Sequence, residues 1–244
     1  MSNLRPLFSA VAPLILDQSK IVRDSTLELF KSPDIMDNLQ YHIDFVILYI
    51  HSAMTHITPE IRSQSTQFLD VLIDAAPKIV CRTAWAKTLS CFFPLLGWSL
   101  DISESKQGMK GPSLASSTVS AGLSLGANST KARLGHLQSL NKLVTVGIDT
   151  ALDENNSGIL FHPDTSKFLM TSTSTNPFAS LSLFGTALST SSSPSVTEDS
   201  TSRLDLIRVY WKSLLLGLQD SIKESGQIGR TAKSLLVLLE QRLS

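Results

Sequence analysis

The 244-residue chain is poor in the residues that build disulfide frameworks, metal sites and membrane spans. Its two cysteines, Cys81 and Cys91, lie in apolar sequence, so we expect buried, reduced thiols and no disulfide framework. No HExxH or CxxC spacing occurs, and the five histidines are scattered, which predicts no metal site. The longest apolar run, Phe45 to Ile50, is far shorter than the roughly 20 residues that cross a bilayer, so no membrane span is expected.

Charge is also scarce. Charged residues make up 17% of the chain, and the formal net charge is +0. Without a basic excess there is no overall attraction to nucleic acid or to anionic lipid. Direct contact with RNA through basic helix faces stays open as an alternative, because Lys131 and several later Lys and Arg residues could line one edge of a helical array.

Signals for catalysis are weak. Residues 122–126 match the Gly-x-Ser-x-Gly pattern of a hydrolase nucleophile, but no strand is predicted before Ser124 and its surroundings are rich in Ser and Gly. No glycine-rich phosphate loop occurs either. We therefore predict no catalytic residue, no cofactor site and no enzyme activity, and a hydrolase function would depend on Ser124 alone.

The apolar residues are concentrated between Tyr41 and Trp98, and their spacing is helical. Thr58 is a suitable N-cap and Pro59 suits the first helical position, so a helix is expected from there to Ala76, where Pro77 ends it. A further helix is predicted over 80–96, ended by Gly97. Each helix is too short to be stable alone and must pack against its neighbours.

The helices before residue 98 repeat. Helices are predicted over 7–16 and 20–30, and again over 35–54, with a bend near Tyr41, and 58–76. Val22-Arg23 near the start of one helix aligns with Ile61-Arg62 in the next unit, an offset of 39 residues. This spacing is typical of helical-pair repeats, so the fold class predicted is all-α, a HEAT/armadillo-like helical solenoid.

Composition predicts how the rest of the chain is organised. Ser/Gly-rich sequence delays the second helix of the third repeat, and Ser/Thr-rich sequence with few apolar residues then separates that helix from a C-terminal helical pair. The predicted units are HEAT-like repeats over 1–98, an insertion over 99–130, a repeat helix over 131–148, a low-complexity tether over 149–202 with an apolar patch at 177–185, and the helical pair over 203–244.

Residues 48–62, LYIHSAMTHITPEIR, are more specific than the repeat pattern. They resemble the Ipi pre-rRNA-processing family, whose metazoan member is testis-expressed protein ten. The likeness continues through 85–89, WAKTL, and returns at 131–140, KARLGHLQSL, and at 223–230, KESGQIGR. It covers most of the chain in the same order.

The resemblance implies a nuclear protein, in nucleoplasm and nucleolus, that belongs to the Rix complex. That complex acts on late pre-60S particles, promotes removal of the second internal transcribed spacer, and works with the AAA ATPase midasin. Its other subunits are a helical-repeat scaffold and a WD-repeat propeller. No catalytic residue transfers from the family, so we expect a scaffold or adaptor. The alternative is a generic HEAT-repeat adaptor in transport or another nuclear assembly.

Family members usually carry a Lys-rich segment before the first repeat, whereas this sequence begins almost at the repeat, at residues 2–6. An RNA-binding or nuclear-import role that depends on such a segment is therefore not expected of these residues. The partner-binding candidates are polar positions beside the family-specific sequence: Arg62, Gln67, Lys87 and Arg133. The competing interpretation is that they are solvated or paired within the chain.

Overall fold

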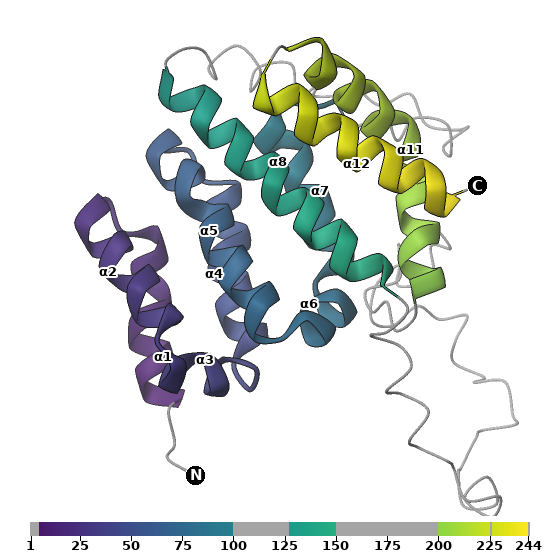
Figure 1. Cartoon of the computed structure of the whole chain (residues 1–244). Helices are drawn as coiled ribbons and strands as arrows, with labels where there is room; N and C mark the ends of the chain where they lie inside the picture. Colours follow the sequence, from purple (N-terminus) through teal and green to yellow (C-terminus); the bar gives the residue numbers. More distant parts are fainter. Residues whose placement is uncertain (1–4, 100–126, 150–199, 225, 244) are drawn as a thin grey trace, which may run out of the picture.

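The described part of the chain is all-helical. The structure is a computed structural model that describes residues 5–99, 127–149, 200–224 and 226–243 (Figure 1). No strand occurs in these residues. The helices are α1 (Arg5–Val11), the short 3₁₀ helix η1 (Ala12–Leu16), α2 (Lys20–Lys31), α3 (Pro33–Leu39), α4 (Ile43–Met54), α5 (Pro59–Ala75), α6 (Pro77–Thr83), α7 (Trp85–Leu96), α8 (Ala127–Ile148), α11 (Ser200–Lys223) and α12 (Gln227–Leu243).

The helices pack as successive pairs. The pairs are η1 with α2, α4 with α5, α7 with α8, and α11 with α12, and we call them the first to fourth pairs. The second helices of the pairs form one layer in the order α2, α5, α8, α12, which Figure 1 shows side by side. The first helices form the other layer in the order η1, α4, α7, α11. One hydrophobic core runs between the layers, from Phe8 in α1 to Leu239 in α12.

The core follows from helical periodicity. In α5, Ile61, Phe68 and Leu72 are each about 1% exposed and lie on one stripe, as the sequence predicts. Gly97 ends α7 with φ +74°, a left-handed conformation that glycine adopts without steric cost, which confirms the predicted stop. Cys81 and Cys91 are free and buried, as expected.

Three predicted helices are each divided in the structure. The one over 7–16 becomes α1 and the 3₁₀ helix η1, with a proline in the first turn of η1. The one over 35–54 becomes α3 and α4, separated at the bend expected near Tyr41, where the His42 ring lies tilted against Phe8 with centroids 4.5 Å apart. The one predicted over 80–96 is interrupted at Ala84, so this boundary prediction is wrong. The interruption lets α6 pack on α5 while α7 packs on α4. Tertiary packing sets that boundary, since neither Thr83 nor Ala84 is a strong helix breaker.

Thr58 occupies the predicted N-cap position of α5, but its side chain makes no capping hydrogen bond. Its backbone N–H instead donates to His56 Nδ1, at 3.1 Å. The predicted insertion and tether, including Ser124 and the patch at 177–185, lie almost wholly outside the described residues. The predicted division of the chain into domains stays a prediction.

Candidate functional site

Arg62, the first of the candidate residues, is held within its own repeat. Its guanidinium Nη1 donates to the carbonyl oxygens of His56 at 2.7 Å and Ile57 at 3.2 Å. These carbonyls belong to the loop between α4 and α5, so Arg62 closes that loop onto the helix that follows it. The half-buried side chain thus has a structural role in this chain.

Arg23 repeats this arrangement one pair earlier. Its Nη1 donates to the carbonyl oxygens of Asp17 at 2.7 Å and Gln18 at 3.0 Å, which lie six and five residues before it. Arg62 spans the same sequence separations. The sequence alignment of Arg23 with Arg62 therefore corresponds to one geometry used twice.

Arg133, on α8, is also engaged within the chain. It forms an ion pair with Glu224 at the end of α11, and its Nη2 lies 3.4 Å from Ser221 Oγ. The contact joins residues 91 positions apart and connects the third pair to the fourth. The Arg133 guanidinium is therefore already paired within the chain.

Gln67 and Lys87 are exposed and are the two candidates still available to a partner. Gln67 belongs to α5 in one layer, and Lys87 belongs to α7 in the other. The structure does not bring the four candidates together into one cluster. Partner binding by any of the four stays a prediction.

A network that the sequence did not reveal crosses the interface between the first and second pairs. Arg23 is only 2% exposed, and its Nε donates to Gln64 Oε1 at 2.7 Å. Gln64 Nε2 in turn donates to Asp24 Oδ1. In the sequence Gln64 cannot be distinguished from other polar helix residues. Its position two residues after Arg62 is the one signal that it could face the preceding pair.

Two buried histidines lie at the interface between the second and third pairs. His51 Nε2 is 2.9 Å from Thr88 Oγ1, and His136 Nδ1 is 3.0 Å from Thr66 Oγ1. Burial, with a smaller effect of the Lys87 charge, lowers the pKa of His51 to about 4. Burial, with a smaller effect of Arg62, lowers the pKa of His136 to about 4. Both rings are therefore neutral near pH 7 and serve as hydrogen-bonding links between pairs.

Carboxylates reinforce this interface. Ser139 Oγ donates to Asp70 Oδ2 at 2.8 Å, and Lys142 Nζ lies 3.2 Å from the Asp70 carbonyl and 2.7 Å from Asp74 Oδ1. Burial raises the pKa of Asp70, although the Ser139 hydrogen bond and the Lys142 charge oppose that rise. The side chains of α8 thus attach to one side of α5.

Tryptophans occupy the interface between the third and fourth pairs. Trp85 Nε1 donates to the Arg203 carbonyl at 3.3 Å, and Arg203 Nε donates to the Gly147 carbonyl at 2.6 Å. The Trp98 ring lies against Gly217 of α11 so closely that a Cβ there would overlap it. Both tryptophans are buried.

The polar groups and rings described above link one helix to another. Within the described ranges, no cluster of three or more His, Cys, Asp or Glu side chains could hold a metal ion. In the same ranges no helix is both long and apolar enough to span a membrane. Burial raises the pKa of the Cys91 thiol, which disfavours the nucleophilic thiolate. Contacts between the described helices and other molecules would therefore involve exposed side chains on the helix surfaces.

Comparison with known proteins identifies the family. A family profile described as "Rix1 complex component involved in 60S ribosome maturation" matches residues 37–144. The pre-rRNA-processing protein IPI1 of Debaryomyces hansenii is 36% identical over 98% of this chain and 72% of that protein. The IPI1 protein of Scheffersomyces stipitis is 33% identical over 98% of this chain and 70% of that protein. The chain belongs to the IPI1 family of pre-rRNA-processing proteins. The family resemblance seen in the sequence is thereby confirmed.

Among solved structures, a chain from a structure titled "Rix1-Rea1 pre-60S particle - 60S core, body 1 (rigid body refinement)" is 28% identical to this IPI1-family chain. The match covers 64% of this chain and 54% of the solved one, with a TM-score of 0.43. The solved chain is thus matched over about half its length. The family assignment depends on the sequence comparisons, which extend over nearly the whole of this chain.

Proposed function

We propose that this IPI1-family chain is a non-catalytic scaffold subunit of the Rix complex that supports pre-rRNA processing and maturation of the 60S ribosomal subunit. The observation that carries the proposal is the match to pre-rRNA-processing relatives along 98% of the chain. The family that matches residues 37–144 is involved in 60S ribosome maturation, which supports the same role here. Removal of the second internal transcribed spacer is the processing step that we assign to the complex.

The architecture supports a scaffold. We interpret the four pairs as a HEAT-like solenoid, because each pair contacts the next in both layers and Arg23 and Arg62 close equivalent loops. A solenoid gains its stability from neighbouring repeats and offers long surfaces on both layers to protein partners. The polar side chains buried between the pairs are used to join helices, so binding is left to exposed residues.

The partners we propose are the helical-repeat scaffold and WD-repeat propeller subunits of the complex, midasin and the pre-60S particle, in the nucleus. Affinity purification of the tagged chain from nuclear extract, followed by mass spectrometry, tests this. Recovery of these subunits together with pre-60S proteins is the expected result. Recovery of transport cargo without ribosomal precursors would instead favour the generic HEAT-repeat adaptor.

Gln67 and Lys87 allow the proposed partner surface to be mapped in the same purification. Lys87→Glu and Gln67→Glu, made separately, change exposed groups on the two layers without removing a described hydrogen bond. Loss of one subunit with one variant assigns that layer to that partner. Arg62→Glu is unsuitable for this purpose, because it would also release the loop that Arg62 closes. If both variants recover every subunit at the parent level, neither position is at an interface.

A further inference from the structure

The helix α12 ends one layer of the described structure. In the layer α2, α5, α8, α12, the inner helices α5 and α8 each have a neighbour on both sides. Helix α12 packs on α8 and on its own partner α11, and no described helix covers its remaining side. The terminal repeats of stacked arrays usually carry a polar outer face that keeps the array soluble. Exposed apolar or unpaired charged residues on this side of α12 would therefore indicate a binding surface.

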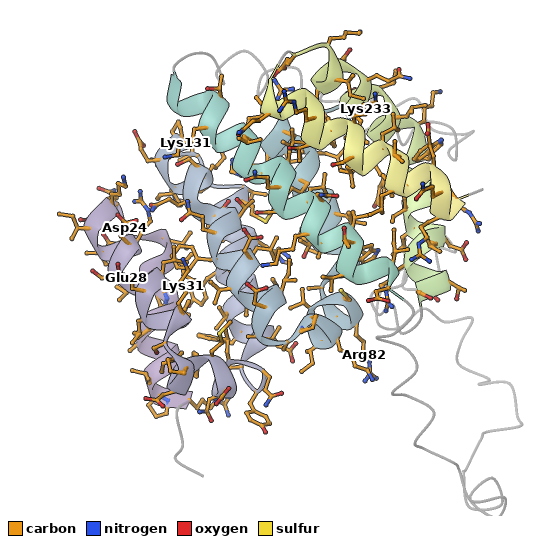
Figure 2. The ribbon with its side chains drawn as sticks, in the orientation of Figure 1. Asp24, Glu28, Lys31, Arg82, Lys131 and Lys233 are labelled. Atoms are coloured by element: carbon orange, nitrogen blue, oxygen red, sulfur yellow. The ribbon has the colours of Figure 1, made fainter. Side chains whose placement is uncertain are left out.

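A shallow open groove of about 470 Å³ follows this uncovered side of α12. Neither Arg230 nor Lys233 forms an ion pair with another described residue, and Val237 is 42% exposed. Figure 2 shows Lys233 as a labelled stick on α12. The residues that line the groove, which we call the α12 groove, are Arg230, Lys233, Ser234, Val237, Leu238 and Gln241.

The charges of the α12 groove are of one sign. Two of its six lining residues are basic and none is acidic. The nearest acidic residue along the helix, Glu240, lines a neighbouring groove with Arg208, Trp211 and Leu243. Elsewhere on the fourth pair, Arg208 pairs with Asp205 and Lys223 pairs with Asp220. Arg230 and Lys233 have no such acidic partner among the residues that line the α12 groove.

The spacing of these residues suits a helix. Arg230 and Val237 are seven residues apart, two turns or roughly 10 Å along the axis. A second helix of about three turns, packed alongside at roughly 8–10 Å, would place acidic groups opposite Arg230 and Lys233 and an apolar group opposite Val237 and Leu238. This follows the usual rule for helix-in-groove recognition, in which anchors recur at i, i+3, i+4 and i+7.

We propose that the α12 groove binds an acidic amphipathic helix of a protein partner. Nucleic acid fits less well, because two cations beside an exposed valine and a partly buried leucine, with Glu240 nearby, give weak attraction for a phosphate backbone. A second copy of the chain docked through the same face also fits less well, because α12 carries one acidic residue, Glu240, to face two cations. The proposal adds a surface and a partner chemistry to the scaffold role, and it relies on that role only for the choice of complex.

The test places a photo-cross-linker, p-benzoylphenylalanine, at position 237 of the tagged full chain within its purified native complex. Mass spectrometry of the cross-linked peptides then identifies what lies opposite α12. The expected product joins position 237 to a segment of another protein that has apolar residues at helical spacing and at least two Asp or Glu within two turns. Arg230→Glu combined with Lys233→Glu should lower its yield at least tenfold.

The matched control is Lys131→Glu, an exposed charge reversal on α8 that should leave the yield unchanged (Figure 2). If the double reversal lowers the melting temperature, the neutral pair Arg230→Gln and Lys233→Gln is used, with a loss of at least threefold expected. A cross-link to RNA, to the same chain, or to a segment without acidic residues overturns the proposal, as does no cross-link at all. If the family's partners still co-purify in that case, only the α12 groove is wrong and the scaffold role stands.

Discussion

The interface between the first and second pairs differs from the interface between the second and third pairs in the kind of polar group that it buries. The first interface buries a permanent charge, Arg23, which is satisfied by two loop carbonyls and by Gln64. The second buries two neutral imidazoles, His51 and His136, each hydrogen-bonded to a threonine. The same helix stacking is thus secured by groups with different responses to pH.

The difference shows that helix periodicity alone does not determine what holds the pairs together. A buried charge is tolerated where backbone carbonyls can solvate it, and the loop before α2 supplies two of them. In the second pair the equivalent loop carbonyls bind the half-buried Arg62, and the buried groups that cross to the third pair include two neutral rings. We therefore expect the two interfaces to fail under different conditions.

The largest expected effect is the loss of stability on acidification, which should come from the second interface and not from the first. The pKa of His51 and of His136 is 6.5 in the unfolded chain and about 4 in the folded one. Between these pH values the unfolded chain therefore binds protons that the folded chain does not bind. Stability then falls as pH drops from 6.5 towards 4, by up to about 1.4 kcal/mol per pH unit for each histidine, and roughly 3 kcal/mol each over the window. Urea unfolding at a series of pH values measures this slope.

The variant His136→Gln serves as the control for the pH experiment. Glutamine can still bond to Thr66 but does not titrate, so the slope below pH 6.5 should fall by about half. Asp70 acts in the opposite direction, because its raised pKa lets the folded protein bind a proton more readily than the unfolded chain on acidification. An unchanged slope in His136→Gln would contradict the assignment of the pH dependence to this interface.

Arginine replacement should break the first interface selectively. Arg23→Ala removes hydrogen bonds from a buried cation to three acceptors and leaves Gln64 without its donor, and we expect a loss of about 3 kcal/mol in the free energy of unfolding. Arg62→Ala removes only the two loop contacts from a half-buried group, for a loss of about 1 kcal/mol. Equal losses in the two variants would mean that the bond to Gln64 contributes nothing.

The sequence predicts the helices and the repeated arginine, but it does not predict the polar contacts that distinguish one interface from the next. Helix positions, the core stripe of α5 and the equivalence of Arg23 with Arg62 follow from local spacing and from an offset of 39 residues. The partners Gln64, Thr66 and Thr88 do not, because their contacts cross 37 to 70 residues and depend on how the helices rotate against each other. Of the candidate partner-binding residues, Arg133 is engaged by Glu224, 91 residues away, which local spacing does not predict. Arg62 is engaged by carbonyls only five and six residues away, and its candidate role did not take account of that loop.

Glycine replacement extends the comparison to the interface between the third and fourth pairs, where aromatic rings pack beside the polar links. A Cβ at position 217 would overlap the Trp98 ring, so Gly217→Ala should lose about 2 kcal/mol after the gain in helix propensity is included. Gly135→Ala, in α8 with no atom within 4 Å of the new Cβ, should instead gain up to about 1 kcal/mol. Thermal or urea unfolding distinguishes the two, and a stabilised Gly217→Ala would show that α11 can move away from Trp98.

The smallest effect is expected at the ion pair of Arg133 with Glu224, which also crosses from the third pair to the fourth. The side chains are 30% and 39% exposed, so solvent screens their attraction and we expect only about 0.5 kcal/mol of coupling. A double-mutant cycle of Arg133→Ala and Glu224→Ala, run at low and high salt, measures this coupling and its screening. Should the coupling exceed about 2 kcal/mol and persist in high salt, solvent would not screen this pair, and the third interface would depend on Arg133 as the first depends on Arg23.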